Sequence, residues 1–141
     1  MKIAEHSIVI NGSLQAAWDK LLDWNTMPDW DIFMKTVHFD GPLAVGSSGG
    51  LILKNGQQFK LHITQLDHMN DYTSEFSTMG TRFIFYHQLT QLSSEKIKMH
   101  FSIDCEGLLS FLVHRLLRKE FESKLAVLME NFKDQLEQSA L

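Results

Sequence analysis

The sequence predicts an α+β fold in which one antiparallel sheet is covered by a long C-terminal helix. Two observations lead to this fold class. First, apolar and polar residues alternate in short runs separated by turn residues, which is typical of half-buried strands. Second, residues 108–141 contain neither Gly nor Pro and carry apolar residues at helical spacing. Each strand and the helix have one apolar face, so we expect these faces to be buried against each other.

The first part of the chain is predicted to form a strand, a short helix and an irregular aromatic segment. Apolar residues share one face of the strand, which ends at residues 11–13. Ser13 is a suitable N-cap for a helix over residues 14–22, because its side-chain oxygen can accept a backbone hydrogen bond there. Residues 24–33 are rich in aromatic side chains and show no regular period.

Six further strands follow in hairpin succession. Residues 46–50, Gly-Ser-Ser-Gly-Gly, are predicted to form a turn or bulge, and Asn55-Gly56 is the strongest hairpin signal in the chain. Short turns between successive strands indicate an antiparallel meander rather than a parallel sheet. The strands are expected at residues 34–39, 51–54, 59–64, 72–78, 82–92 and 97–106.

The C-terminal segment is predicted to form one unbroken helix. At about 1.5 Å per residue it would be roughly 45–50 Å long. A helix of that length needs a large apolar partner, which only the strands before it can supply. Its apolar stripe consists of Val113, Leu117, Phe121, Leu125, Leu128, Phe132 and Leu136.

Length and composition fit one domain over residues 1–141. The net charge is −4 and the basic residues form no long cluster, which argues against binding to nucleic acid. The single cysteine, Cys105, excludes an internal disulfide and a cysteine-rich metal site. No segment is predicted to be a signal peptide or an integral membrane span. These features favour a soluble protein of the cytoplasm.

A series of short motifs runs through the chain. They are the strand and Ala-Ala-Trp helix of residues 8–22, Trp24 with Met-Pro-Asp-Trp-Asp at 27–31, Gly-Pro-Leu at 41–43 with Gly46-Ser47, Gly50 and Gly56, Glu106-Gly107 before the last helix, and Asn-Phe-Lys at 131–133 through Glu137. In order and spacing these motifs resemble the START-like helix-grip superfamily (SRPBCC), in particular its polyketide cyclase/dehydrase and lipid-transport group. The resemblance covers essentially the whole chain as one START-like domain.

The resemblance implies a curved antiparallel sheet of about seven strands wrapped around the C-terminal helix. It also implies one or two short helices between the first two strands, and an apolar cavity between sheet and helix. Members bind lipids, sterols, polyketides or hormones, catalyse cyclisation and dehydration of such ligands, or bind protein partners. Because the superfamily shares no universal catalytic residue, the fold by itself assigns no activity.

The inward faces of the strands and the helix supply the candidate cavity wall. A pocket uses only part of such a set, and the remaining residues form packed core. The candidate cavity residues are Trp30, Phe33, Phe59, Leu61, Phe76, Phe83, Phe85, His87, Met99, Phe101, Val113, Leu117 and Phe121.

Polar candidates for catalysis are few, and they lie on one strand. His87 shares a strand face with Phe83 and Phe85, so its imidazole would point into the cavity, where it could orient a polar ligand group or move a proton. A core histidine with a satisfied hydrogen bond is the alternative. If the opposite face of this strand points inward, Arg82 and Tyr86 take the place of His87 as an anion partner and a hydroxyl donor.

Two carboxylates flank an aromatic residue in the irregular segment. Asp29 and Asp31 stand on either side of Trp30, and one of them would lie at the cavity mouth unless both are solvated, which is the more common outcome for a loop carboxylate. No motif for a metal, a phosphate loop or a nucleophile elbow occurs, so no metal and no cofactor is expected.

Three functions stay open at this point. The first is non-enzymatic binding or transport of a hydrophobic or amphipathic small molecule, such as a lipid, a sterol or a polyketide-like compound. The second is a polyketide cyclase or dehydratase, and the third is a protein-partner module. Residues 108–117 carry more apolar surface than one sheet face covers. They are expected to form a gate, a homodimer contact or a transient membrane contact.

Overall fold

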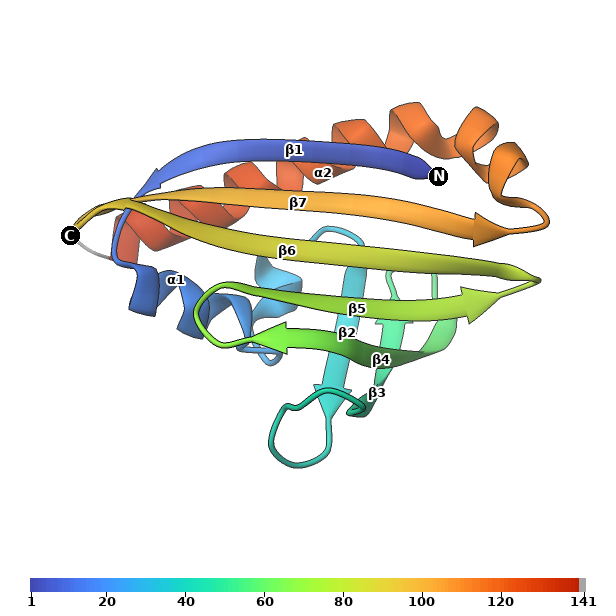
Figure 1. Cartoon of the computed structure of the whole chain (residues 1–141), viewed down its shortest axis with the longest axis horizontal. Coiled ribbons are helices and arrows are strands. Elements are labelled where there is room, and N and C mark those ends of the chain that lie inside the picture. Colours follow the sequence, from blue (N-terminus) through green and yellow to red (C-terminus); the bar gives the residue numbers. More distant parts are fainter. Residues whose placement is uncertain (140–141) are drawn as a thin grey trace.

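A seven-stranded antiparallel sheet curls around the long helix α2 in the computed structural model, which describes residues 1–139 (Figure 1). This architecture confirms the predicted fold class. The predicted last helix includes residues 140 and 141, which lie outside the described range. In chain order the elements are β1 Lys2–Asn11, α1 Leu14–Leu21, the 3-10 helix η1 Met27–Asp29, β2 Met34–Phe39, β3 Ser48–Leu53, β4 Gln58–Asp67, β5 Asp71–Thr78, β6 Thr81–Ser93, β7 Lys96–Gly107 and α2 Ser110–Ser139.

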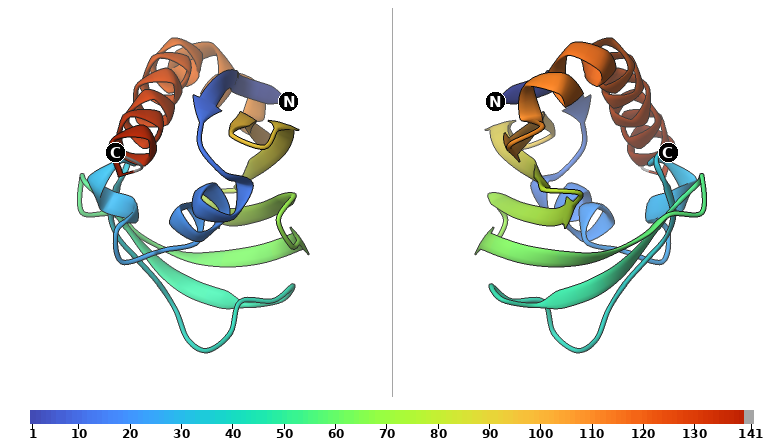
Figure 2. Two further views of the ribbon diagram at one scale, coloured as in Figure 1. Left: turned by 90° about the vertical axis from the view of Figure 1, so that its left-hand side faces the viewer. Right: turned by 90° about the vertical axis from the view of Figure 1, so that its right-hand side faces the viewer.

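The sheet is a meander of strands β2 to β7, and β1 is added at the β7 edge. The strand order is β1-β7-β6-β5-β4-β3-β2, and every neighbouring pair is antiparallel. The pairing of β1 with β7 brings distant parts of the chain side by side, with Ile8 opposite Met99. Figure 2 shows the sheet as a curved trough with α2 along its open side and α1 near one end.

The short helix α1 forms where the sequence places its N-cap. Ser13 has extended backbone, and its hydroxyl oxygen accepts a hydrogen bond from the backbone N–H of Ala16 at 3.1 Å. This bond satisfies one of the free N–H groups of the first turn. On the inward side of the helix Ala17, Trp18 and Leu21 are buried, so α1 closes the trough with apolar side chains.

Strand β3 begins earlier than predicted, because Gly49 and Gly50 are strand residues rather than part of a turn. Gly49 pairs with Phe39, and Gly50 pairs with His38, both on β2. A Cβ on Gly50 would come within 2.5 Å of the His38 ring, and one on Gly49 would overlap the carbonyl oxygen of His38. Glycine is therefore needed here for the close approach of β2, which the turn-like composition of the segment does not reveal.

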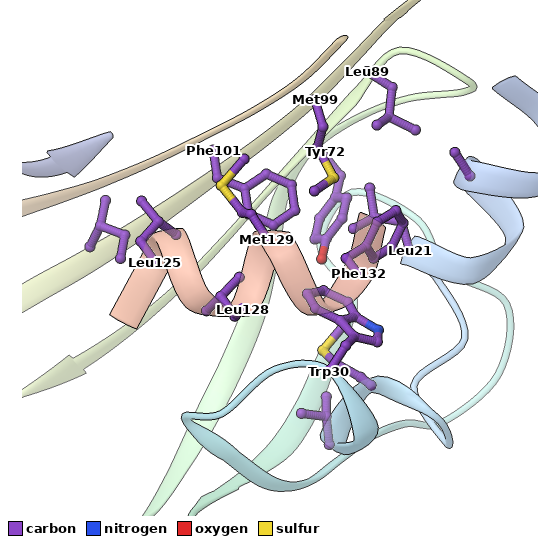
Figure 3. Packing of buried hydrophobic residues seen from close by; sticks show 14 of the residues in the cluster. Leu21, Trp30, Tyr72, Leu89, Met99, Phe101, Leu125, Leu128, Met129 and Phe132 are labelled. Carbon is purple, nitrogen blue, oxygen red and sulfur yellow. The ribbon is translucent and has the colours of Figure 1, made fainter. Parts of the chain in front are cut away.

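The C-terminal half of α2 forms the centre of the core. Its buried residues, Leu125, Leu128, Met129, Phe132 and Leu136, face the concave side of the sheet. Phe132 packs edge-on against Trp30, with ring centroids 4.9 Å apart at an interplanar angle of 84° (Figure 3). This half of the helix is therefore held by the sheet on one side and by the segment after η1 on the other.

The N-terminal half of α2 is much less buried. The stripe residues Val113, Leu117 and Phe121 are only half-buried. The first turns expose a set of large apolar side chains. Among the described residues no helix is both long enough and apolar enough to cross a bilayer. The exposed apolar residues at this end are Leu108, Leu109, Phe111, Leu112 and Leu116.

The difference between the halves gives a testable prediction. Phe132→Ala should lower the free energy of unfolding by about 3–5 kcal/mol, because it removes a fully buried ring and leaves a hole beside Trp30. Phe111→Ala, at an exposed site on the same helix, is the matched control and should change it by less than about 0.5 kcal/mol. Urea unfolding followed by tryptophan fluorescence measures both. An equal loss of unfolding free energy in the two variants would contradict the conclusion that the C-terminal half of α2 forms the core and the N-terminal half does not.

Candidate functional site

A cavity of about 340 Å³ lies between the sheet and the middle of α2. Strands β3 to β7 and the segment after η1 form most of its wall, and residues 117–128 of α2 form the side facing the sheet. The exposed residues of the wall come from three places: Asn55 in the β3–β4 turn, Met79 in the β5–β6 turn and Glu120 on α2. These three places surround the mouth of the cavity.

The structure places most of the predicted cavity residues in this wall. Two of them lie elsewhere. Met99 is fully buried and packs beside Leu89 on the neighbouring strand (Figure 3), and Val113 is half-buried on α2 outside the wall. The predicted residues that do line the cavity are Trp30, Phe33, Phe59, Leu61, Phe76, Phe83, Phe85, His87, Phe101, Leu117 and Phe121.

A row of stacked phenylalanine rings forms one side of the cavity. Phe76 lies at its centre: its ring centroid is 4.4 Å from that of Phe59, 5.3 Å from Phe83 and 5.5 Å from Phe85, all in stacked geometry. These residues come from the neighbouring strands β4, β5 and β6, where side chains on one face alternate along each strand. The result is a continuous aromatic surface.

His87 lies on the inner face of β6, directly opposite Tyr72 of β5. The two rings are stacked with centroids 4.1 Å apart and planes 11° from parallel, and Phe101 contacts the imidazole edge-on at 4.7 Å. The Nδ1 atom lies 3.3 Å from the backbone oxygen of Tyr72. Because a carbonyl oxygen only accepts, Nδ1 carries the proton and donates it, so Nε2 remains an unprotonated acceptor.

The protein environment keeps this imidazole neutral. Burial lowers the pKa of His87 to about 4, and the hydrogen bond to the Tyr72 carbonyl opposes that shift only in part. The accessible part of the ring faces the cavity, because His87 belongs to the wall. The cavity therefore contains a neutral acceptor rather than a cation at neutral pH.

Two buried polar residues of the wall, Asp31 and Tyr72, are absent from the list of candidate cavity residues, although Asp31 is one of the two carboxylates considered for the cavity mouth. Asp31 is 8% exposed, and its Oδ1 accepts a hydrogen bond from the backbone N–H of Phe33 at 3.0 Å. Burial raises the pKa of the Asp31 carboxyl to about 7. Tyr72 is 2% exposed, and burial together with the nearby Asp31 raises the pKa of its phenol. In Figure 3 the Tyr72 hydroxyl points from the sheet towards α2.

The sequence contains a signal for one of these two residues. Tyr72 has the same strand parity as Phe76, so the alternation along β5 predicts that both side chains point inward. Asp31 follows the irregular turn of η1, where no period indicates which side is buried. Of the two carboxylates beside Trp30, Asp29 is exposed as expected, whereas Asp31 is buried in the cavity wall.

The alternative polar pair also lies on β6. Arg82 is paired with Glu106 on β7, and its other guanidinium nitrogen lies 3.9 Å from Glu75. The Tyr86 hydroxyl donates a hydrogen bond to Asp71 at 3.3 Å. Arg82 is exposed outside the cavity wall, whereas Tyr86 belongs to the wall, with its hydroxyl bonded to Asp71. No group of three or more metal-ligating side chains gathers anywhere within residues 1–139.

A pH titration of stability tests the state of His87. Relative to His87→Phe, which keeps the stacked ring, the wild type should lose about 3 kcal/mol of stability as the pH falls from about 6.5 to about 4. The sign follows from the lowered pKa, because over this range the unfolded chain binds a proton that the folded one does not. Urea unfolding of both proteins at several pH values gives the difference. Parallel curves would show that the imidazole is not enclosed.

No protein-family model and no curated protein matches this sequence. Several solved structures are similar to this structure. A START superfamily protein from Mycobacterium smegmatis is 15% identical, with a TM-score of 0.72 over 94% of this chain and 97% of that one. Norcoclaurine synthase from Thalictrum flavum, in complex with dopamine and hydroxybenzaldehyde, is 11% identical, with a TM-score of 0.67 over 93% and 83%.

A third similar structure is DynU16, from the dynemicin biosynthetic locus. It is 14% identical, with a TM-score of 0.74 over 96% of this chain, which spans 47% of that protein. At these identities the likeness concerns the fold and leaves the activity open. The curled seven-stranded sheet, the short helices after β1 and the long last helix are common to the predicted superfamily and to this structure. The chain has the START-like helix-grip fold.

Proposed function

We propose that this protein binds a hydrophobic or amphipathic small molecule in the cavity between the sheet and α2. The observation behind the proposal is a cavity of about 340 Å³ that the surrounding aromatic side chains leave unfilled. Pockets for small molecules occupy about 300–1,000 Å³ and are lined mainly by apolar side chains with few polar groups. Packed cores leave few voids larger than a water molecule, so a void of this size is characteristic of a binding site.

The affinity for such a ligand would come mainly from apolar burial. Phe85 and Phe121 are only half-buried in the ligand-free protein, and both belong to the cavity wall. A ligand that covers apolar surface of this kind gains about 25 cal/mol per Å² removed from water. A ligand with many polar groups would lose hydration without replacement, because the wall offers few hydrogen-bond partners. The cavity therefore favours an apolar body with a small polar part.

The structural neighbours support a small-molecule role. The norcoclaurine synthase structure holds two small aromatic compounds, and another neighbour is a START superfamily protein. Their fold provides a sheet and a helix that can enclose a ligand. Because the identities are low, the ligand class of this chain has to be argued from its own side chains.

A cavity-filling substitution tests the proposal. Ser74 is buried on β5 and lines the cavity, so the ring of Ser74→Phe should fill it and weaken ligand binding by about tenfold or more. Ser77→Phe places the same ring at an exposed site of the same strand and should bind normally.

Native mass spectrometry of the purified proteins, before and after exposure to fatty acids, sterols and aromatic compounds, measures occupancy, and melting temperatures verify that the variants are folded. A wild type that retains nothing and binds no member of the panel would rule out the proposed function.

A second function, acid–base catalysis of cyclisation or dehydration on a polyketide-like substrate, is favoured by the state of His87. Its ring belongs to the cavity wall, and Nε2 is unprotonated at neutral pH. Such a nitrogen can accept a proton from a carbon next to a carbonyl group, which starts an aldol-type ring closure, but its lowered pKa makes it a weaker base than a free imidazole. The alternative pair is engaged elsewhere: Arg82 is paired with Glu106 outside the cavity wall, and the hydroxyl of Tyr86, a residue of the wall, is bonded to Asp71.

The enzymatic alternative has its own test. With a linear poly-β-ketone as substrate, His87→Phe should lower kcat by about 100-fold or more, while the stacked ring keeps the cavity intact. Mass spectrometry of the products over time measures turnover, and binding of the substrate is recorded in parallel. Tight binding by the wild type without turnover would exclude catalysis on this substrate and leave the binding function in place.

A further inference from the structure

The cavity contains one carboxyl group that no cation of the protein neutralises. Asp31 is buried in the wall, and none of the ion pairs in the part of the chain that the structure describes involves it. Lys54, the nearest basic influence on this carboxyl, is exposed on the β3–β4 side. Lys124 at the cavity mouth is bonded to Glu120 at 2.7 Å. A buried carboxylate without a paired cation is energetically unfavourable, because it has lost its hydration and gained no counter-charge.

The hydrogen-bonding groups near Asp31 leave acceptors without donors. One oxygen of Asp31 accepts the Phe33 N–H, and the other has no hydrogen-bond partner within residues 1–139. His87 uses its only N–H on the Tyr72 carbonyl, so it offers the cavity an acceptor. The free donors among these wall residues are the Tyr72 hydroxyl and Nε1 of Trp30, which is buried without a hydrogen-bond partner within residues 1–139, and neither is bonded to Asp31. A ligand that supplies several donors would therefore complete the set.

The charges of the wall narrow the choice of ligand. A carboxylate or phosphate at Asp31 would face a like charge, and Lys124, the lysine of the cavity wall, is already bonded to Glu120. A protonated amine supplies both the missing charge and up to three donors. The aromatic rings of Trp30, Tyr72 and Phe101 line the same cavity, and aromatic faces attract an ammonium group.

We propose that the cavity selects ligands whose polar end is a protonated amine, which pairs with the Asp31 carboxylate while the apolar body lies along the Phe59–Phe76–Phe83 wall. This inference rests on the proposed binding function and specifies its ligand class. Of the other groups of the wall, the Tyr72 hydroxyl and the neutral His87 add no competing positive charge, and Lys124 is paired with Glu120 at the mouth.

Amine binding should be coupled to ionisation of Asp31. In the free protein the carboxyl is partly protonated near pH 7, because burial raises its pKa. Pairing with an ammonium group favours the charged form of the Asp31 carboxyl, so amine binding at pH 7 releases a fraction of a proton from it. The affinity for the amine therefore rises as the pH increases through about 7. The ionisable groups that face this carboxyl are Tyr72 and Lys54, with His87 farther along the wall and the Glu120–Lys124 pair at the mouth.

The test uses three probes with one apolar body: naphthylethylamine, naphthylethanol and naphthylacetate. The wild type should bind the amine at least about tenfold more tightly than the alcohol and should not bind the acetate. Asp31→Asn preserves the acceptor for Phe33 N–H and should remove this tenfold preference without weakening the alcohol. Asp29→Asn, an exposed carboxylate two residues away, is the matched control and should behave like the wild type.

Isothermal titration in buffers of different ionisation enthalpy measures both affinity and proton release in the wild type, so the result does not depend on the variant alone. Equal affinity for amine and alcohol, or amine binding without proton release, would overturn the amine assignment and leave the binding function standing. Failure of all three probes and of every compound in the earlier panel would overturn both.

Discussion

The packing of the C-terminal half of α2 into the curled sheet is the contact on which the other features depend. Leu125, Leu128 and Phe132 are buried there, and each such side chain contributes about 1.5–3 kcal/mol by leaving water. The helix continues beyond this contact as one element of thirty residues. Residues 117–128, in the middle of the helix, lie over the cavity, and the strands form its opposite wall. The contact that forms the core therefore also positions one wall of the cavity.

Much of this arrangement can be predicted from alternation and helical period. Spacing alone places Phe83, Phe85 and His87 on one strand face and predicts the stripe along α2, but it leaves open which face of that strand points into the cavity. Spacing does not distinguish an inward residue that lines the cavity from one that is packed in the core. Met99 has the inward parity of a cavity residue, yet its side chain is fully buried in the core beside Leu89. Spacing predicts which residues share a face of a strand. How far each of these residues lies from the cavity depends on how the whole sheet curves.

Irregular segments set a second limit. Asp31 has neither strand nor helix period, and a carboxylate in a loop is solvated in most proteins. Its burial results from the turn of η1, which directs Trp30 onto Phe132 and carries the next residue into the wall. Tyr72 shows the opposite case, because its parity with Phe76 is visible in the sequence. The sequence does not show, however, that Asp31 lies close enough to Tyr72 to raise the pKa of its phenol.

The two buried ionisable groups of the cavity affect stability in opposite directions. Asp31 has a raised pKa, so it lowers stability as the pH rises towards about 7, whereas His87 has a lowered pKa and lowers stability as the pH falls from about 6.5 towards about 4. Between about pH 4 and pH 7 both side chains are mainly uncharged. Over that range neither buried group adds a charge to the cavity, and above it Asp31 adds one negative charge.

The pairing of β1 with β7 has a consequence for the way the chain is made. Lys2 lies opposite Asp104, so β1 has no strand partner until about a hundred more residues have been added. At about 5–20 residues per second this takes roughly 5–20 s. During that time the apolar residues of β1 are unprotected, until β7 supplies the sheet edge with which β1 pairs. The growing chain thus carries an uncovered apolar strand through most of the synthesis of this domain.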